Sequence, residues 1–300
     1  MKIVFFILAI LASTMAFAQQ DAMFTHYMYN TIAVNPAYAG SRDALTVTAL
    51  HRSQWVGFED SPITQTLSIH SPVIAGLGLG LSVVNDDLGP LNNRSYYLDV
   101  SYRIKFEKSY LSFGLKGGVN TFNLDIASLE SQTPNDPLLT GNSEKDINPN
   151  FGAGVYYYTD KYYLGLSAPK LLENSSNTDA SIDAKRHYFF IAGAYFELNN
   201  NIKFKPTAFV KVVPSAPIEL DVTASFVFFD VFGIGAMYRT GDAVGVLASF
   251  DLTKQLTIGY SFDWSMVNKT GEYNKGSHEL MLRYDFLFVS PKKIKSPRNF

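Results

Sequence analysis

The sequence has 300 residues, of which 47% are hydrophobic and 14% aromatic, and it contains no cysteine. The absence of cysteine excludes disulfides, thiol catalysis, cysteine-ligated metals and lipid attachment to a cysteine. The formal charge of −2 argues against nucleic-acid binding, which needs a basic face.

Residues 1–18 have the features of a cleaved secretory signal peptide. Lys2 precedes an apolar run from Ile3 to Ala12, and Ala16-Phe17-Ala18 places small residues where signal peptidase reads them. The run is too short to span a bilayer comfortably, and the polar pair Gln19-Gln20 follows it. We therefore expect export and cleavage near Ala18; an uncleaved membrane anchor is the alternative.

Residues 19–42 form a segment that lacks strand-like alternation but is too apolar for a loose tail. Our candidates for partner binding in this segment are Phe24, Tyr27, Met28, Asn35, Pro36 and Tyr38. Two interpretations remain open. The segment fills the interior of the domain that follows it, or it forms a docking face in the periplasm.

From residue 43 to residue 289, apolar and polar residues alternate in about fourteen segments, a pattern typical of an all-β transmembrane barrel. The segments are Leu45–Ala49, Ile63–His70, Gly76–Val83, Tyr96–Phe106, Leu111–Lys116, Phe151–Tyr157, Tyr162–Leu166, Tyr188–Phe196, Ile202–Lys211, Ile218–Phe226, Phe232–Tyr238, Val244–Phe250, Leu256–Trp264 and Leu280–Phe288. An even number of antiparallel strands suits a bacterial outer-membrane barrel.

The connections between these segments support the barrel independently. The even-numbered ones are short, as in Glu107-Lys108-Ser109 and Asn199-Asn200-Asn201. Several odd-numbered ones are long: Arg52–Pro62, Asn85–Asn93, Phe122–Asn150, Pro169–Lys185 and Ser265–Gly276. Short periplasmic turns and longer extracellular loops are the usual arrangement in such barrels.

The residue types on the two faces of the strands predict which face contacts the membrane and which faces the lumen. Aromatic residues such as Tyr96, Phe106 and Trp264 lie near strand ends on the apolar face, as an interfacial girdle requires. The opposite face carries charged residues that we expect in the lumen: Asp99, Arg103, Lys105, Lys116, Lys203, Lys205, Lys211, Glu219, Asp221, Asp251, Asp263, Arg283 and Asp285. A soluble β-sandwich is the competing architecture.

Glycine recurs at every second position in Gly76-x-Gly78-x-Gly80, inside a predicted strand. This spacing does not match a phosphate-binding loop. Because glycine has no side chain, the stripe predicts space inside the barrel for another segment or a large side chain.

No catalytic, cofactor-binding or metal-binding set of residues emerges from the sequence. The five histidines (His26, His51, His70, His187 and His278) lie far apart and show no metal-binding spacing. Asp86-Asp87 lies among Gly, Pro and Asn residues, which is typical of a solvated turn. We predict that the protein is not an enzyme and needs no cofactor. An outer-membrane hydrolase is kept as a third hypothesis, because a triad is identified by geometry and not by composition.

Residues 290–300 form a basic tail beyond the last predicted strand. We expect this tail in the periplasm, because an even-stranded barrel ends on the side where its first strand begins. Its candidates for partner binding are Ser296, Pro297, Arg298 and Phe300.

Five short motifs resemble the PorP/SprF family of type IX secretion system membrane proteins of the Bacteroidetes. They are Gln20-Asp21-x-x-Phe24-Thr25-x-Tyr27-Met28-x-Asn30, Asn35-Pro36-Ala37-Tyr38-Ala39-Gly40-Ser41, His51-Arg52-x-Gln54-Trp55-x-Gly57-Phe58 with Pro62 and Thr64, Asp86-Asp87-x-Gly89-Pro90, and Ser296-Pro297-Arg298-x-Phe300. They occur in order along the mature chain and are specific as a set, although Asn299 stands where an aromatic residue is expected. Trp55 and Phe58 therefore join the candidates for partner binding.

The resemblance implies a non-enzymatic protein of the outer membrane that assists secretion of specific large cargo, often adhesins, and retains it at the surface. The implied partners are that cargo, periplasmic components of the secretion and gliding machinery, and outer-membrane lipid, with no nucleic acid. The alternative is a diffusion porin, in which the region between Phe122 and Pro149 folds inward to constrict the pore.

Overall fold

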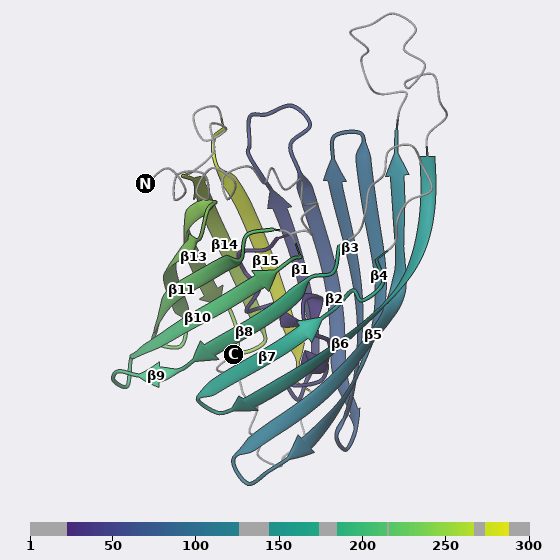
Figure 1. Ribbon diagram of the computed structural model, residues 1–300. Helices are drawn as coiled ribbons and strands as arrows, with labels where there is room; N and C mark the ends of the chain where they lie inside the picture. The colour runs from purple at the N-terminus through teal and green to yellow at the C-terminus, as the bar shows by residue number, and fades with distance from the viewer. Residues whose placement is uncertain (1–22, 126–143, 174–184, 215, 267–273, 288–300) are drawn as a thin grey trace, which may run out of the picture.

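The computed structural model describes residues 23–125, 144–173, 185–214, 216–266 and 274–287. These residues form one closed sheet of antiparallel strands, with the N-terminal part of the described chain inside it (Figure 1). A single closed sheet excludes the β-sandwich that competed with the barrel. Within these ranges, no helix is long and apolar enough to cross a membrane.

The strands follow one another around the barrel in chain order. Their bounds are β1 (Leu45–Ser53), β2 (Ile63–Ile74), β3 (Leu77–Leu88), β4 (Leu91–Lys105), β5 (Ser109–Leu124), β6 (Glu144–Thr159), β7 (Tyr162–Ala168), β8 (Tyr188–Ala194), β9 (Phe196–Glu197), β10 (Ile202–Val212), β11 (Glu219–Phe228), β12 (Phe232–Arg239), β13 (Ala243–Asp251), β14 (Leu256–Ser265) and β15 (Ser277–Phe286). Strands β8 and β9 both pair with β10 and are separated by Tyr195 alone, so they act as one strand. The barrel therefore has 14 strands, which confirms the predicted fold class.

Strand β15 closes the barrel by pairing with β1 along its whole length, from Leu45 opposite Phe286 to Ser53 opposite His278. The strand ends at Phe286, two residues earlier than the alternation predicts. Phe288 lies outside the described residues, as do the predicted signal peptide and the predicted basic tail.

The two ends of the barrel differ in their connections (Figure 1). At one end, which we call the short-turn end, the connections are brief: 75–76, 106–108, 160–161, 198–201, 229–231 and 252–255. The opposite end, which we call the long-loop end, carries longer connections such as 54–62 and 266–276. By the usual rule for outer-membrane barrels, the short-turn end faces the periplasm and the long-loop end faces the exterior.

Strands extend into two of the predicted long loops. Strands β3 and β4 continue to Leu88 and from Leu91, so the predicted loop Asn85–Asn93 is a tight turn at Gly89-Pro90. Gly89 has a φ of +54°, a conformation that glycine adopts without strain. In the predicted loop Phe122–Asn150, β5 continues to Leu124 and β6 already begins at Glu144, while residues 126–143 lie outside the described part of the chain. These strand ends are rich in Asn and Asp, as in Asn85-Asp86-Asp87, so the alternation that predicts a strand is too weak to recognise there.

The predicted orientation of the strand faces is confirmed. Leu115 and Leu166 point outward, with exposed fractions of 68% and 61%. Seven of the predicted inward charges are buried, namely Asp99, Lys116, Lys211, Asp221, Asp263, Arg283 and Asp285. Lys116 lies 3.0 Å from Asp99 on the neighbouring strand, for example. Lys105, by contrast, is exposed at the end of β4. Aromatic residues of the predicted girdle are exposed on the outer surface, namely Tyr96, Phe106, Tyr162, Tyr238 and Trp264.

Candidate functional site

Residues 23–44 run through the interior of the barrel, and we call them the lumen segment (Figure 1). Two 3₁₀ turns, η1 (Thr31–Ala33) and η2 (Pro36–Tyr38), shorten the path of the segment. The Asn35 side chain accepts a hydrogen bond from the backbone N–H of Ala37, and proline fixes the backbone at the first position of η2. The segment thus satisfies part of its backbone locally and leaves other groups for the barrel wall.

At the long-loop end, Glu279 of β15 holds the start of the lumen segment. Its carboxylate accepts hydrogen bonds from the backbone N–H groups of Thr25 (2.8 Å) and His26 (2.7 Å), and it also lies 2.7 Å from His26 Nδ1. Arg52 at the end of β1 lies 2.7 Å from Asp263 and 3.4 Å from Glu279. All of these charged side chains are buried, so the stability of each depends on its partners.

At the short-turn end, Asp285 of β15 holds the end of the lumen segment. The guanidinium of Arg42 donates to both of its carboxylate oxygens, at 3.1 and 2.8 Å, and the hydroxyl of Thr46 donates at 2.7 Å. Nearby, Asp43 forms an ion pair of 2.7 Å with Arg103 of β4. The strand that closes the barrel therefore carries the acidic partners of both ends of the segment.

Strands β3 to β7, which we call the packed wall, lie directly against the lumen segment. A Cβ added to Gly78 would overlap the carbonyl oxygen of Ala39, and one added to Gly114 would overlap the backbone nitrogen of Ala37. The prediction that the glycine stripe leaves room for another segment is confirmed at Gly78. It is also confirmed at Gly80, where the side chain of Ile32 fills the space. Gly76 instead lies in the turn between β2 and β3, with a φ of +81°.

Polar side chains of the packed wall donate hydrogen bonds to the backbone of the lumen segment. Ser101, Ser167 and Lys116 donate to carbonyl oxygens of the segment at 2.6, 2.7 and 3.3 Å. In return, the Asn35 amide donates to the carbonyl oxygen of Val155 at 3.0 Å. These bonds satisfy buried backbone groups that would otherwise cost about 1–3 kcal/mol each.

Aromatic rings fix the segment laterally. Tyr27 stacks on Phe209 of β10 with a centroid distance of 4.8 Å, and its hydroxyl lies 3.0 Å from Thr207. On the other side, Tyr38 meets Tyr156 edge to face at 5.4 Å.

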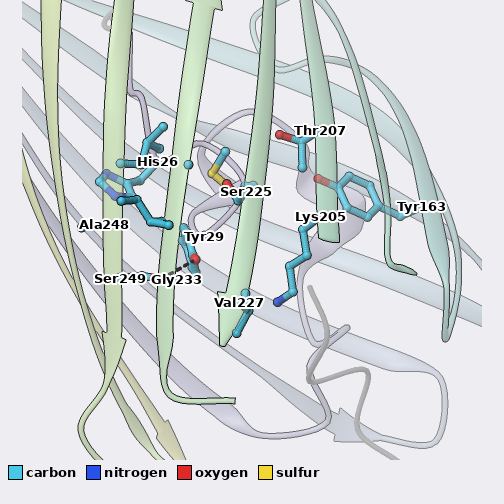
Figure 2. A pocket seen from close by; sticks show the side chains of 14 residues that line it. His26, Tyr29, Tyr163, Lys205, Thr207, Ser225, Val227, Gly233, Ala248 and Ser249 are labelled. Atoms are coloured by element: carbon cyan, nitrogen blue, oxygen red, sulfur yellow. Dashed lines mark hydrogen bonds between the residues drawn. The ribbon is translucent and has the colours of Figure 1, made fainter. Parts of the chain in front are cut away.

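The wall formed by β10 to β13, which we call the cavity wall, is separated from part of the lumen segment by a cavity of about 40 Å³ (Figure 2). Figure 2 shows Tyr29 of the segment and Lys205 of β10 among its lining residues, with the Tyr29 hydroxyl bonded to Ser249 at 3.2 Å. Ser225 and Thr207 add polar groups to the lining. The rest of the lining is largely apolar, with Val227, Ile234 and Leu247 among its residues.

The structure separates the predicted partner-binding residues into distinct places. Phe24, Tyr27, Asn35, Pro36 and Tyr38 are buried inside the barrel, and Met28 is partly buried beside them. The alternative of a periplasmic docking face does not fit them, because their surfaces are already covered by the barrel. Trp55 and Phe58 lie in the β1–β2 connection at the long-loop end. Ser296, Pro297, Arg298 and Phe300 fall outside the described residues.

Sequence reasoning missed the acidic residues that hold the lumen segment. Asp263 and Asp285 are on the predicted inward face, and Glu279 alternates with the outward Leu280, but nothing in the pattern shows that their partners are in residues 23–44. Arg52 lies in one of the family-like motifs, and its ion pairs supply a structural role for that residue.

In the described ranges, no group of three or more His, Asp or Glu side chains is arranged to hold a metal ion. His51 lies 3.2 Å from the hydroxyl of Ser53, but its other ring nitrogen faces the amide of Gln65 and not a carboxylate. This pair therefore lacks the acidic member of a hydrolytic triad.

Solved structures that the chain resembles are outer-membrane barrels. The Acinetobacter baumannii outer membrane protein Omp33 matches with a TM-score of 0.48 and 10% identity, over 82% of this chain and 100% of that one. A Pseudomonas aeruginosa FadL homologue matches with a TM-score of 0.48 and 12% identity, over 84% and 93%. The KdgM porin matches with a TM-score of 0.41 and 12% identity, over 81% and 100%. No curated protein matches the sequence.

The closed sheet with an apolar exterior and a polar, filled lumen defines an integral β-barrel protein of the outer membrane. The family model for the type IX secretion system membrane protein PorP/SprF matches residues 16–284. The chain belongs to this family and is an outer-membrane component of the type IX secretion system.

Proposed function

We propose that this barrel assists the secretion and surface attachment of one large cargo protein, such as an adhesin, and that it does so without catalysis. The observation that carries the proposal is the lumen segment, which occupies the interior of the barrel. A filled lumen supports a role in holding a partner more than a role in passing solutes. The family membership supports the same role.

The long-loop end offers a surface for such a partner. Large apolar side chains in or beside its connections are exposed: Phe58, Leu88, Ile147, Leu171, Leu172, Ile218 and Met266. The short-turn end exposes apolar side chains too, such as Phe229, so it is the extracellular position of the long-loop end that makes its exposed side chains candidates for a cargo contact. Trp55 and Phe58 in the β1–β2 connection are our first candidates for cargo contact.

Deleting the gene tests the proposal. We expect the cargo protein to be absent from the cell surface, as measured by antibody labelling of intact cells. Normal display of every large surface protein would contradict the proposal. In a complemented strain, a Trp55→Ala/Phe58→Ala variant should reduce display several-fold. Phe229→Ala, at an exposed turn of the short-turn end, is the matched control and should leave display unchanged.

The periplasmic part of the proposal concerns the predicted basic tail. Strand β15 ends at the short-turn end, so the residues after it start on the side where the periplasmic secretion and gliding machinery lies. Removing residues 290–300 should leave the barrel assembled but lower its co-purification with periplasmic components. Unchanged co-purification would remove the tail, with Ser296, Pro297, Arg298 and Phe300, from the proposal.

The porin alternative predicts a different measurement. A diffusion porin shows a steady open conductance in planar bilayers, whereas a barrel filled by the lumen segment should remain closed or pass only small currents. A steady, large conductance of the intact protein would favour the porin. A variant lacking residues 23–42 that still assembles should conduct, because the occupant of the lumen has been removed.

A further inference from the structure

The lumen segment begins at the long-loop end of the barrel. The hydroxyl of Thr25 donates to Asp263 at 2.6 Å, and Asp263 is paired with Ser277 at the rim where the 266–276 connection leaves the barrel. Met23 Sδ lies 3.2 Å from Nζ of Lys211, which is one residue from the end of β10. The first described residues therefore lie near the extracellular rim.

The segment finishes at the opposite end. The backbone N–H of Gly40 donates to Nδ1 of His70 at 3.2 Å, close to the turn between β2 and β3. Asp43 pairs with Arg103, which precedes the turn between β4 and β5. Strand β1 then starts at Leu45, opposite the last residue of β15.

The pairing of β1 fixes this direction. Because β1 begins at the short-turn end, the residues just before it must also be at that end. A segment that fills the lumen before β1 therefore runs from the long-loop end to the short-turn end. In an even-stranded barrel without such a segment, both chain ends emerge on the periplasmic side. Here the first described residues lie at the extracellular end, and only the closing strand ends at the periplasmic one.

We infer that the chain enters the barrel from the outside, so that Met23 is reached from the cell surface and not from the periplasm. This entry lies at the same end of the barrel as the β1–β2 connection with Trp55 and Phe58, where we propose that an exported protein binds. The role of the exported protein rests on the proposed function; the direction of the chain does not.

Buried contacts hold this arrangement in place. Glu279 accepts two backbone N–H groups and lies beside His26, so a segment withdrawn from the lumen would leave a buried carboxylate with fewer partners. The Arg42–Asp285 pair holds the opposite end of the segment in the same way. The segment is therefore a fixed part of the barrel, and the entry of the chain at the long-loop end is fixed with it.

Labelling of a single cysteine tests the inference, since the chain has no cysteine of its own. A short Gly-Ser spacer that contains one cysteine is inserted immediately before Met23, downstream of the predicted cleavage site. Intact cells are treated with a membrane-impermeant maleimide, and a second sample is treated after the outer membrane has been permeabilised. Glu59→Cys at the long-loop end and Asp160→Cys at the short-turn end are the two reference variants.

We expect the inserted cysteine to react in intact cells to the same extent as Glu59→Cys. Reaction only after permeabilisation, as expected for Asp160→Cys, would overturn the inference. Heat-modifiable migration on gels shows whether each variant contains a folded barrel. Labelling is independent of cargo display, so loss of the proposed function would not affect this result.

A cross-link within the barrel provides a second measurement. In a Met23→Cys/Lys211→Cys variant, a short bifunctional maleimide should join the two positions, whereas Met23→Cys/Asp160→Cys should remain unlinked. The opposite pattern would show that the segment runs the other way. This measurement needs no insertion and applies to the purified full-length protein.

Discussion

The packed wall and the cavity wall contact the same lumen segment in different ways. On the packed wall, Gly114 brings the strand backbone against Ala37, and Ser101 and Ser167 bond to the backbone of the segment. On the cavity wall, a cavity lies between the segment and the strands, and Tyr29 crosses it to reach Ser249. The difference shows that the barrel supports its occupant mainly from one side.

The two walls therefore determine two different properties of the lumen: the position of the segment, and the place of any water-filled path. The position of the segment is set by β3 to β7, where a side chain added to a glycine would meet backbone atoms that cannot move away. We therefore expect any water-filled path through the barrel to follow the other side. The ends of the segment are held mainly by Glu279 and Asp285 of the closing strand, with further contacts from Lys211 of β10 and Arg103 of β4.

The largest loss of stability should come from removing the contacts that Glu279 makes at the long-loop end. Glu279→Gln removes a buried charge that faces Arg52 and His26, and loss of one partner from a buried ion pair costs about 3–5 kcal/mol. We expect a large fall in the temperature at which the barrel unfolds on gels. Asp242→Asn is the control, because Asp242 pairs with Arg239 at the rim and its side chain is 36% exposed. That change should cost about 0–1 kcal/mol. Equal effects of the two changes would show that Glu279 does not hold the segment.

A smaller effect is expected from adding one methyl group to each wall. Gly114→Ala places Cβ against the backbone of Ala37, and overpacking of this kind costs about 1–3 kcal/mol. Gly235→Ala on the cavity wall meets chiefly the hydroxyl of Ser225, a side chain that can rotate away. We expect Gly114→Ala to lower the unfolding temperature clearly and Gly235→Ala to change it little. The contrast between the walls would be wrong if Gly235→Ala were the more damaging change.

Some of these features can be predicted from the sequence and others cannot, for physical reasons. A period of two residues is local, so the strand faces, the inward charges and the glycines at Gly78 and Gly80 are visible without a structure. The contacts of Glu279 with Thr25 join residues 254 positions apart, and no local pattern encodes such a pairing. The segment itself was recognisable as too apolar for a tail, but its direction follows only from the pairing of β1 with β15.

The smallest expected effect is on conductance, and it tests where a path through the barrel lies. Tyr29→Ala removes a ring that lines the cavity and would enlarge it towards β13, so we expect small conductance steps in planar bilayers. Tyr38→Ala removes the same kind of side chain beside Tyr156, where the segment lies directly against the packed wall. We expect this variant to stay as closed as the wild type. Larger currents through Tyr38→Ala than through Tyr29→Ala would place the path along β3 to β7. In that case the close packing of the packed-wall glycines against the lumen segment would not be what closes the barrel to ions.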